Sequence, residues 1–393
     1  MKGTSSTVCA FIVVLIVLMF PFSVSAQENL VLHYAGVALS GESKDSKVAF
    51  PNTQAFMDMK EPGGKDPDIL DNALNQHLAG LQFDGFTLNH DLGNSDKGDS
   101  LSLAFVVTWE NVAKEQIGSK YKVTYDLRAE ALVFDFHTKT IIAAYPFGMQ
   151  RHDVSPNAPT QIDKQNAFRK MYLDPQNSIL DTFVRTLQTA RIRRSYGAYA
   201  QVVDVSFEPK ALDMMASLEE ASPERAKDFI ATAFETSLMK NASIPILPHV
   251  IGQAIGNQMA IKFANANVYN LTLPKSDFRI TITVHGFKKV PVDENTLETG
   301  FAYANYMKVN ISQPLMDAPY LDGDFKFAVS KTVPKTVLKT DDWAAYQESI
   351  LSFMDGLTKQ FSSSDSDWLD KWGNDSVTSS QIEDAAQALS RCK

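Results

Sequence analysis

The chain has 393 residues and a formal net charge of -9 at pH 7. Hydrophobic residues make up 44% of it and charged residues 21%, which is typical of a globular protein and excludes a largely disordered one. The acidic balance argues against a nucleic-acid-binding protein and against one held by charge on anionic lipid. The chain is long enough for two ordinary domains, each with its own core.

Residues 1–26 have the pattern of a secretory signal peptide. Lys2 carries a positive charge, Val8 to Phe22 is almost wholly apolar, and residues 24–26 are small enough for a cleavage site. An N-terminal membrane anchor is the alternative, but the apolar run is near the short end for spanning a bilayer. We therefore expect a mature chain that begins at Gln27, is periplasmic or secreted, and keeps no transmembrane helix after signal cleavage.

Cysteine usage indicates the same kind of compartment. The sequence has two cysteines, Cys9 in the signal segment and Cys392 next to the C-terminus. An exported chain of this length with no internal disulfide fits a bacterial periplasm better than a eukaryotic extracellular space. We expect Cys392 to be a free thiol on a frayed tail, and pairing between molecules is the alternative.

Residues 27–195 are predicted to form a first α+β unit. A strand over 29–39 precedes a helix that Asp66 and Pro67 should begin, and three strands and a second helix follow. The first of the three alternates from Leu101 to Trp109. The next two form the hairpin Tyr121–Phe147, in which apolar positions alternate with Lys122, Thr124, Asp126, Arg128 and Glu130. We expect one apolar face and one wet or charged face there.

Residues 196–361 repeat this order of elements and are predicted to form a second α+β unit. A strand over 199–207 precedes a helix that Ser222 and Pro223 should cap, then come three strands and a helix capped at Asp341. The predicted fold class is therefore α+β with two similar units, each an antiparallel sheet of about four strands with helices on one face. The recurring order suggests an internal duplication, although the residues themselves do not align.

Residues 362–393 are expected to be a polar C-terminal tail with a short helix from about Gln381 to Leu389. Trp368 and Trp372 are four residues apart and would share one face of a helix. Packing onto the second unit is the preferred interpretation of the two rings, and a partner-binding patch is the alternative.

No catalytic or metal-binding motif stands out along the chain. The nucleophile motif GxSxG is missing, and the Gly-Asp-Ser-Leu at 98–101 precedes a strand instead of following one. No metal-ligand spacing joins the histidines, which are His33, His77, His90, His137, His152, His249 and His285. We therefore predict no catalytic residue, no metal site and no cofactor.

Three other segments are weak candidates for a site. The loop 90–99 holds three Asp and an Asn, which suit calcium, but their spacing differs from an EF-hand. Glu110 and Glu115 are interpreted as a polar connection between two strands more readily than as an acid–base pair. The apolar run 244–256 is expected to be a buried connector or to line a cleft between the units.

The basic cluster of the chain comprises Arg185, Arg191, Arg193 and Arg194. Cations near the end of a helix complement its dipole, which gives a structural reason for them. Three arginines within four residues, at the connection between the units, can also hold carboxylate or phosphate groups in bidentate fashion. These four residues are the candidate anion-binding site, and the partner is an unknown envelope protein or an anionic ligand.

Two functional hypotheses remain. The first is an exported, soluble, non-enzymatic bacterial envelope or secreted protein that acts through binding surfaces, in assembly or ligand binding. The alternative is a secreted hydrolase with a dispersed carboxylate and histidine site. The lack of a well-placed nucleophile favours the first, and convergence of a histidine and two carboxylates in a concave pocket would favour the second.

Overall fold

The computed structural model describes residues 30–41, 46–59, 69–89, 101–117, 119–218, 221–249, 258–263, 268–337, 340–363 and 365–393. The expected signal peptide, the helix start at Asp66 and Pro67, the acidic loop 90–99 and the segment 250–256 lie outside these residues. In the described part of the chain, no helix is long and apolar enough to cross a membrane.

The first sheet has seven strands in the order β2-β1-β3-β4-β5-β8-β7. They are β1 (Leu30–Ser40), β2 (Phe86–Asn89), β3 (Leu101–Ile117), β4 (Lys120–Asp135), β5 (Thr140–Ser155), β7 (Gln258–Phe263) and β8 (Val268–Thr272). β1 pairs with β3 in parallel, and β3, β4 and β5 form antiparallel pairs. The prediction of about four antiparallel strands is wrong for this sheet. It has seven strands, because β2 and also β7 and β8 from the second half of the chain join it, and it is mixed, because β1 is parallel to both β2 and β3.

The second sheet has four strands in the order β11-β10-β9-β6. They are β6 (Ala200–Phe207), β9 (Phe278–Glu294), β10 (Glu298–Ser312) and β11 (Leu321–Pro334). β6 pairs with β9 in parallel, and β9, β10 and β11 form antiparallel pairs. The order β6-β9-β10-β11 therefore matches β1-β3-β4-β5 of the first sheet in both sequence and direction.

The helices form two groups, one from each half of the chain. The first comprises α2 (Ser46–Ala49), α3 (Pro51–Met57), α4 (Ile69–Leu78), α5 (Gln161–Leu173) and α6 (Ile179–Thr189). The second comprises α7 (Pro209–Ala216), α8 (Pro223–Ala242), α9 (Asp342–Gln360), α10 (Ser366–Trp372) and α11 (Ser379–Ser390). The side chains of Ser222 and Asp341 cap α8 and α9, which confirms both predicted helix starts.

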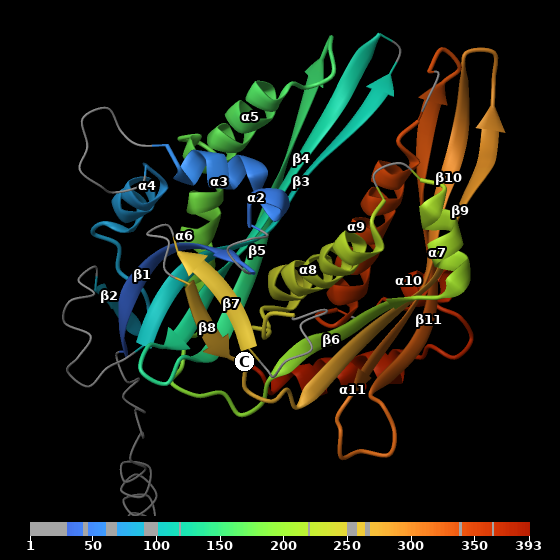
Figure 1. The fold of residues 1–393 in the computed structure, drawn as a ribbon. Helices are drawn as coiled ribbons and strands as arrows, with labels where there is room; N and C mark the ends of the chain where they lie inside the picture. Colours follow the sequence, from blue (N-terminus) through green and yellow to red (C-terminus); the bar gives the residue numbers. More distant parts are fainter. Residues whose placement is uncertain are drawn as a thin grey trace, which may run out of the picture.

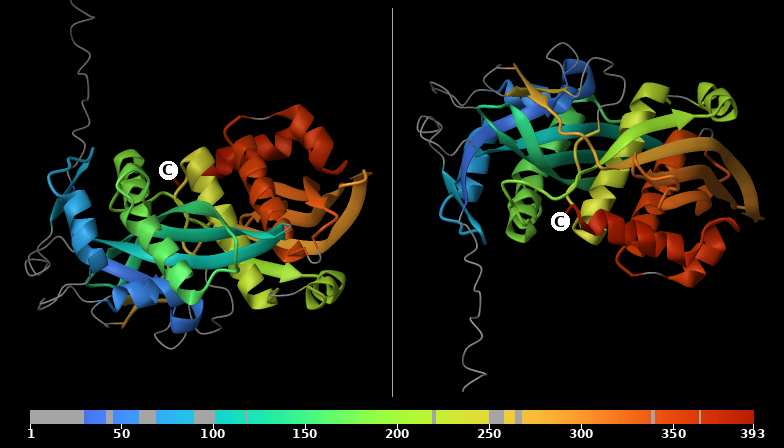
Figure 2. Two further views of the ribbon diagram at one scale, coloured as in Figure 1. Left: turned by 90° about the horizontal axis from the view of Figure 1, so that it is seen from above. Right: turned by 90° about the horizontal axis from the view of Figure 1, so that it is seen from below.

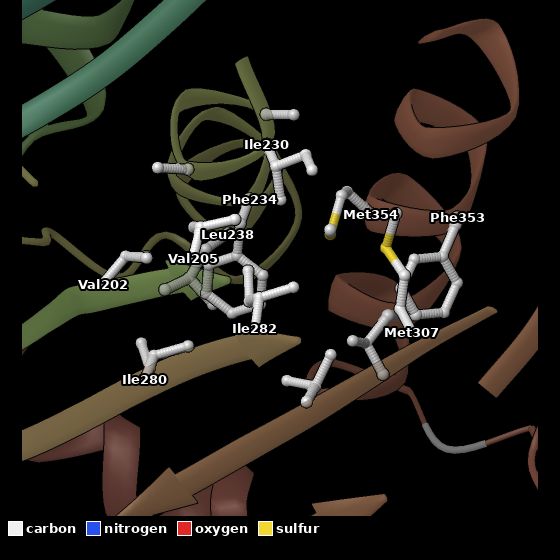
Figure 3. Packing of buried hydrophobic residues seen from close by; sticks show 14 of the residues in the cluster. Val202, Val205, Ile230, Phe234, Leu238, Ile280, Ile282, Met307, Phe353 and Met354 are labelled. Carbon is white, nitrogen blue, oxygen red and sulfur yellow. The ribbon is translucent and has the colours of Figure 1, made fainter. Parts of the chain in front are cut away.

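Helices α8 and α9 lie between the two sheets (Figure 1). α8 contacts β3 and β5 of the first sheet and β6 of the second, while α9 packs on β10 and β11. The views from above and below show α5 and α6 on the other side of the first sheet (Figure 2). The core of the second unit is shown in Figure 3 and includes Val202, Val205, Ile230, Phe234, Leu238, Ile280, Ile282, Met307, Phe353 and Met354.

The second face of β4 is charged, as expected, but three of its charged residues are buried instead of facing water. Asp126, Arg128 and Glu130 are 5%, 3% and 2% exposed. The predicted alternation is confirmed, since the apolar residues Val123, Tyr125 and Leu127 pack in the core beneath α5 and α6. The other face is covered because α8, contributed by the second unit, packs against this sheet.

The C-terminal segment is part of the fold and not a frayed tail. Cys392 is 1% exposed, and burial raises the pKa of its thiol to about 12. Trp368 stacks on Phe353 with ring centroids 6.4 Å apart, and Trp372 lies 4.6 Å from Phe327. The two tryptophans therefore pack onto the second unit as preferred. Cys392 is a free thiol, but the prediction that it lies on a frayed tail was wrong.

Candidate functional site

A pocket of about 210 Å³ opens between the first sheet and α8. Residues from the end of β1 and from β7 complete its wall. β3 and β4 supply two of its polar side chains, α8 supplies three, and the connection after α8 supplies a histidine. We call it the Glu130 pocket, and these side chains are Trp109, Glu130, Arg225, Asp228, Glu235 and His249.

A β-bulge in β3 places Trp109 in this pocket. The register with β4 shifts between Val107 and Trp109, so Thr108 is an extra residue. Val107 packs in the core beneath α5 and α6, whereas the Trp109 ring lies 5.6 Å from that of Phe229 on α8. One extra residue moves the side chains that follow to the opposite face. The predicted alternation from Leu101 to Trp109 was therefore wrong at its last position.

The same bulge turns Glu110 toward α3, where its role is structural. Its Oε1 accepts from the backbone N–H of Asn52 (2.9 Å) and its Oε2 from that of Thr53 (2.8 Å). Both donors belong to the first turn of α3, so Glu110 caps this helix from a neighbouring strand. Glu115 lies in the same strand and pairs with Lys331 at 2.8 Å. The interpretation of Glu110 and Glu115 as a polar connection between strands was wrong, because both are buried within β3.

Two buried polar atoms of the Glu130 pocket have no hydrogen-bond partner in the described part of the chain. One is Oε1 of Glu130, which is 2% exposed, and the other is Nε1 of Trp109, which is 4% exposed. A buried polar group left unpaired costs about 1–3 kcal/mol. One is an N–H donor, which requires an acceptor, and the other is a carboxyl oxygen, which can accept from a donor.

His249 lies between two carboxylates of α8. Its Nδ1 is 3.1 Å from Oε2 of Glu235 and its Nε2 is 3.5 Å from Oδ1 of Asp228. The chain reaches this place because Ser243 ends α8 in a left-handed conformation and the following residues return along the helix. Burial alone would lower the pKa of His249, but Glu235 and then Asp228 outweigh burial and raise this pKa to about 10. The imidazole is therefore an imidazolium at neutral pH.

Glu130 is the neutral member of this group. Burial raises its pKa, the nearby charge of Glu235 raises it further, and His249 opposes both, with a result of about 8. The carboxyl group therefore holds its proton at pH 7 and can donate a hydrogen bond or a proton.

The two arginines beside the pocket differ in how fully they are engaged. Arg128 pairs with Asp126 at 2.8 Å and donates to the backbone oxygen of Phe229 and to Thr232. Arg225 lies 4.7 Å from the centre of the Trp109 ring and donates one bond, to the backbone oxygen of Glu110. Among the described residues no carboxylate forms an ion pair with Arg225, although the charges of Asp228 and Glu110 act on its guanidinium from farther away.

The four predicted anion-binding arginines are all exposed and lie elsewhere in the fold. Arg185 is within α6 and bonds Thr182, whereas Arg191, Arg193 and Arg194 follow the end of that helix. The backbone oxygen of Arg191 accepts from the hydroxyls of two tyrosines. None of these arginines lines the Glu130 pocket, and their role as an anion site stays a prediction.

The residues that form the pocket were missed as a group, although each gave a partial signal. Glu130 stood on the charged face of a strong strand, and Asp228 and Glu235 are seven residues apart, which places them on one face of a helix. His249 appeared in the sequence as one of seven histidines without metal-ligand spacing and as part of an apolar connector. No pattern in the sequence predicted that α8 would pack against β4.

Known proteins provide no further guide to this site. No protein-family model matches the chain, and no curated protein matches it either. In the described part of the chain, no group of three or more His, Cys, Asp or Glu side chains is arranged to hold a metal ion.

Proposed function

We propose that the chain is an exported protein that binds a small zwitterionic molecule, such as an amino acid, in the Glu130 pocket. The observation that carries this proposal is that two residues lining one cavity, Trp109 and Glu130, each have a buried polar atom without a partner, Nε1–H and Oε1. Small-molecule sites combine such a cavity with a few converging polar groups. Export is proposed from the signal-peptide pattern of residues 1–26, and no nucleic-acid partner is proposed because the chain is acidic.

The charges around the pocket indicate the ligand class. Asp228 and Glu130 offer carboxyl groups to an ammonium group, while Arg225 and Trp109 offer donors to a carboxylate. An ammonium group beside Glu130 would favour its ionised form, so binding should release a proton near neutral pH. A ligand with only one of the two charged groups would leave the other half of the pocket unpaired.

Calorimetry with three sets of compounds tests this proposal. The sets are amino acids, the amines without the carboxylate, and the carboxylic acids without the amine. Amino acids should bind most tightly, and heats measured in buffers of different ionisation enthalpy should reveal proton release. If no compound binds, the proposed ligand-binding function fails.

A matched pair of variants tests the role of the Trp109 donor. Trp109→Phe removes the N–H and should weaken ligand binding about tenfold, as expected for one lost hydrogen bond to a charged group. Trp343→Phe changes another tryptophan of the same core outside this pocket and should leave binding unchanged. Equal effects of the two changes would contradict the assignment.

A hydrolase is the second candidate function, because a histidine and carboxyl groups converge in the Glu130 pocket. A histidine and four carboxyl groups, including the helix-capping Glu110, line one concave pocket, and Glu130 keeps its proton at pH 7. Glu130 would act as general acid and the half-exposed Asp228 as general base. The test measures turnover of a library of esters, amides and glycosides by the wild type and by Glu130→Gln. Turnover by the wild type that is lost in the variant would support catalysis. If the wild type turns over no compound, ligand binding is left as the proposed function.

We also propose that the two units arose by internal duplication. The support is the matching order of β1-β3-β4-β5 and β6-β9-β10-β11, each with a parallel first pair. Superposing these two sets of strands tests the idea. Equivalent Cα positions along all four strands are expected, and opposite handedness of the two helical crossovers would contradict it.

A further inference from the structure

A second hollow lies on the second sheet, on the opposite face of β10 from α9. It encloses about 920 Å³ between α7, the outer face of β9, β10 and β11, and the end of α10. At its centre His285 bridges two carboxylates, with Nδ1 2.8 Å from Oε1 of Glu208 and Nε2 2.9 Å from Oδ1 of Asp324. We call it the His285 groove.

Positive charge dominates this groove although the protein is acidic. Four lysines line it, namely Lys210, Lys288, Lys326 and Lys371. The acidic side chains of the lining are Glu208 and Asp324, and both are paired with His285. Among the described residues none of the four lysines forms an ion pair, so their charges are available to an anionic ligand.

Aromatic rings stand beside two of these charges. Nζ of Lys326 lies 5.7 Å from the centre of the Tyr306 ring, and Nζ of Lys371 lies 4.6 Å from that of Trp372. Both rings are half-buried in the wall of the groove. The groove therefore combines cations with flat apolar surfaces, which suits a ligand whose rings carry negative charge.

Two other classes of polyanion fit less well. An acidic peptide that added a strand to the sheet would need the edge of β11, but Gly373 and Asn374 already pair there with Phe325 and Asp324. A duplex nucleic acid carries a denser charge than a polymer with one carboxylate per sugar, so the net charge of -9 opposes its binding more strongly.

We propose that the His285 groove binds an acidic polysaccharide, with carboxylated sugar rings packed on Tyr306 and Trp372 and their carboxylates beside the lysines. This proposal is independent of the Glu130 pocket, since the groove lies on another face of the second unit. It gives the exported protein a means of attachment to an extracellular or envelope polymer.

Binding of the full chain to four polymers tests the proposal. Polygalacturonate carries both rings and carboxylates, its methyl ester carries the rings without charge, polyglutamate carries charge without sugar rings, and single-stranded DNA carries phosphates. Polygalacturonate should retard the protein most strongly in affinity electrophoresis. Equal retardation by polyglutamate or DNA, or no retardation by polygalacturonate, would overturn the proposal.

Charge-matched variants locate the site. Changing the four groove lysines to Gln should weaken binding about tenfold or more at low salt, because each exposed ion pair contributes a factor of roughly two to five. The control changes Lys47, Lys120, Lys170 and Lys275, which are exposed outside the groove, to Gln. Melting temperatures of both variants should match the wild type. Equal loss of binding in the two variants would assign it to net charge and overturn the groove as the site.

Discussion

Two histidines of this protein each have one Asp and one Glu as partners, but they differ in how deeply they are buried. His249 and His285 each lie between two carboxylates. His249 is 12% exposed and has one buried partner, Glu235 at 5%, and one half-exposed partner, Asp228 at 47%. His285 is 32% exposed, and both of its partners are half-exposed, Glu208 at 49% and Asp324 at 42%. The contacts of His285 are shorter, at 2.8 and 2.9 Å, yet water surrounds its partners. Contact distance alone therefore does not show which group matters for stability.

The difference follows from the cost of desolvating charge. A buried carboxylate needs its partner, because removing one member of a buried pair leaves an uncompensated charge. An exposed pair exchanges protein contacts for water at little net gain. We infer that the His249 group is a rigid part of the Glu130 pocket, while the His285 group neutralises the acids of its groove.

The largest expected effect is that of His249→Leu. The change leaves Glu235 buried without its cation and should lower the free energy of unfolding by about 3–5 kcal/mol. Urea unfolding at pH 7 measures this loss. The double variant His249→Leu, Glu235→Leu should recover much of the stability, because it leaves no unpaired charge. A single variant as stable as the wild type would show that Glu235 is well hydrated in the fold.

Glu130 should give the protein a pH dependence of opposite sign to that of an ordinary surface carboxylate. Its pKa is raised from 4.5 to about 8, so between these values the folded state holds a proton that the unfolded state has lost. The Glu130 contribution to the free energy of unfolding should fall by about 1.4 kcal/mol for each pH unit across this window. Below pH 4.5 it should be constant.

Glu130→Gln isolates this dependence, because an amide of the same shape cannot ionise. The difference between variant and wild type should grow from pH 5 to pH 8 in favour of the variant. His249 contributes a separate loss of stability as the pH rises from 6.5 to about 10, which both proteins share. A constant difference across the range would place the pKa of Glu130 near its ordinary value.

Replacing the more exposed His285 should change the free energy of unfolding less than replacing His249, and the change should depend on salt. His285→Leu is expected to lower the free energy of unfolding by less than about 1 kcal/mol, because its partners are solvated. Raising the salt concentration should reduce this effect further. Urea unfolding in low and high salt measures it, and a loss as large as that of His249→Leu would contradict the comparison.

The sequence allowed the alternation of β4 and the caps of α8 and α9 to be predicted, because these depend on neighbouring residues. It did not reveal the bulge at Thr108, which reverses the face of Trp109 and places this residue in the lining of the pocket. Nor did it reveal that α8 covers the charged residues of β4, since that contact joins segments about a hundred residues apart. Charged residues at every second position of a predicted strand can therefore face solvent or lie beneath another element. The tertiary structure is needed to distinguish the two cases.

The smallest expected effect on stability is that of replacing Arg191, Arg193 and Arg194. All three side chains are exposed, in contrast to the buried Arg128. They follow α6, which ends at Thr189, so the dipole of that helix accounts for little of their presence. Changing all three to Ala should therefore leave the melting temperature nearly unchanged. If they form an anion site, the same variant should elute earlier than wild type from an anionic-polymer column, and the gap should narrow as salt is raised. The lysine variant of the His285 groove serves as the comparison, because it removes more charge from a different face. Early elution of that variant alone would leave the three arginines without a role in binding anions.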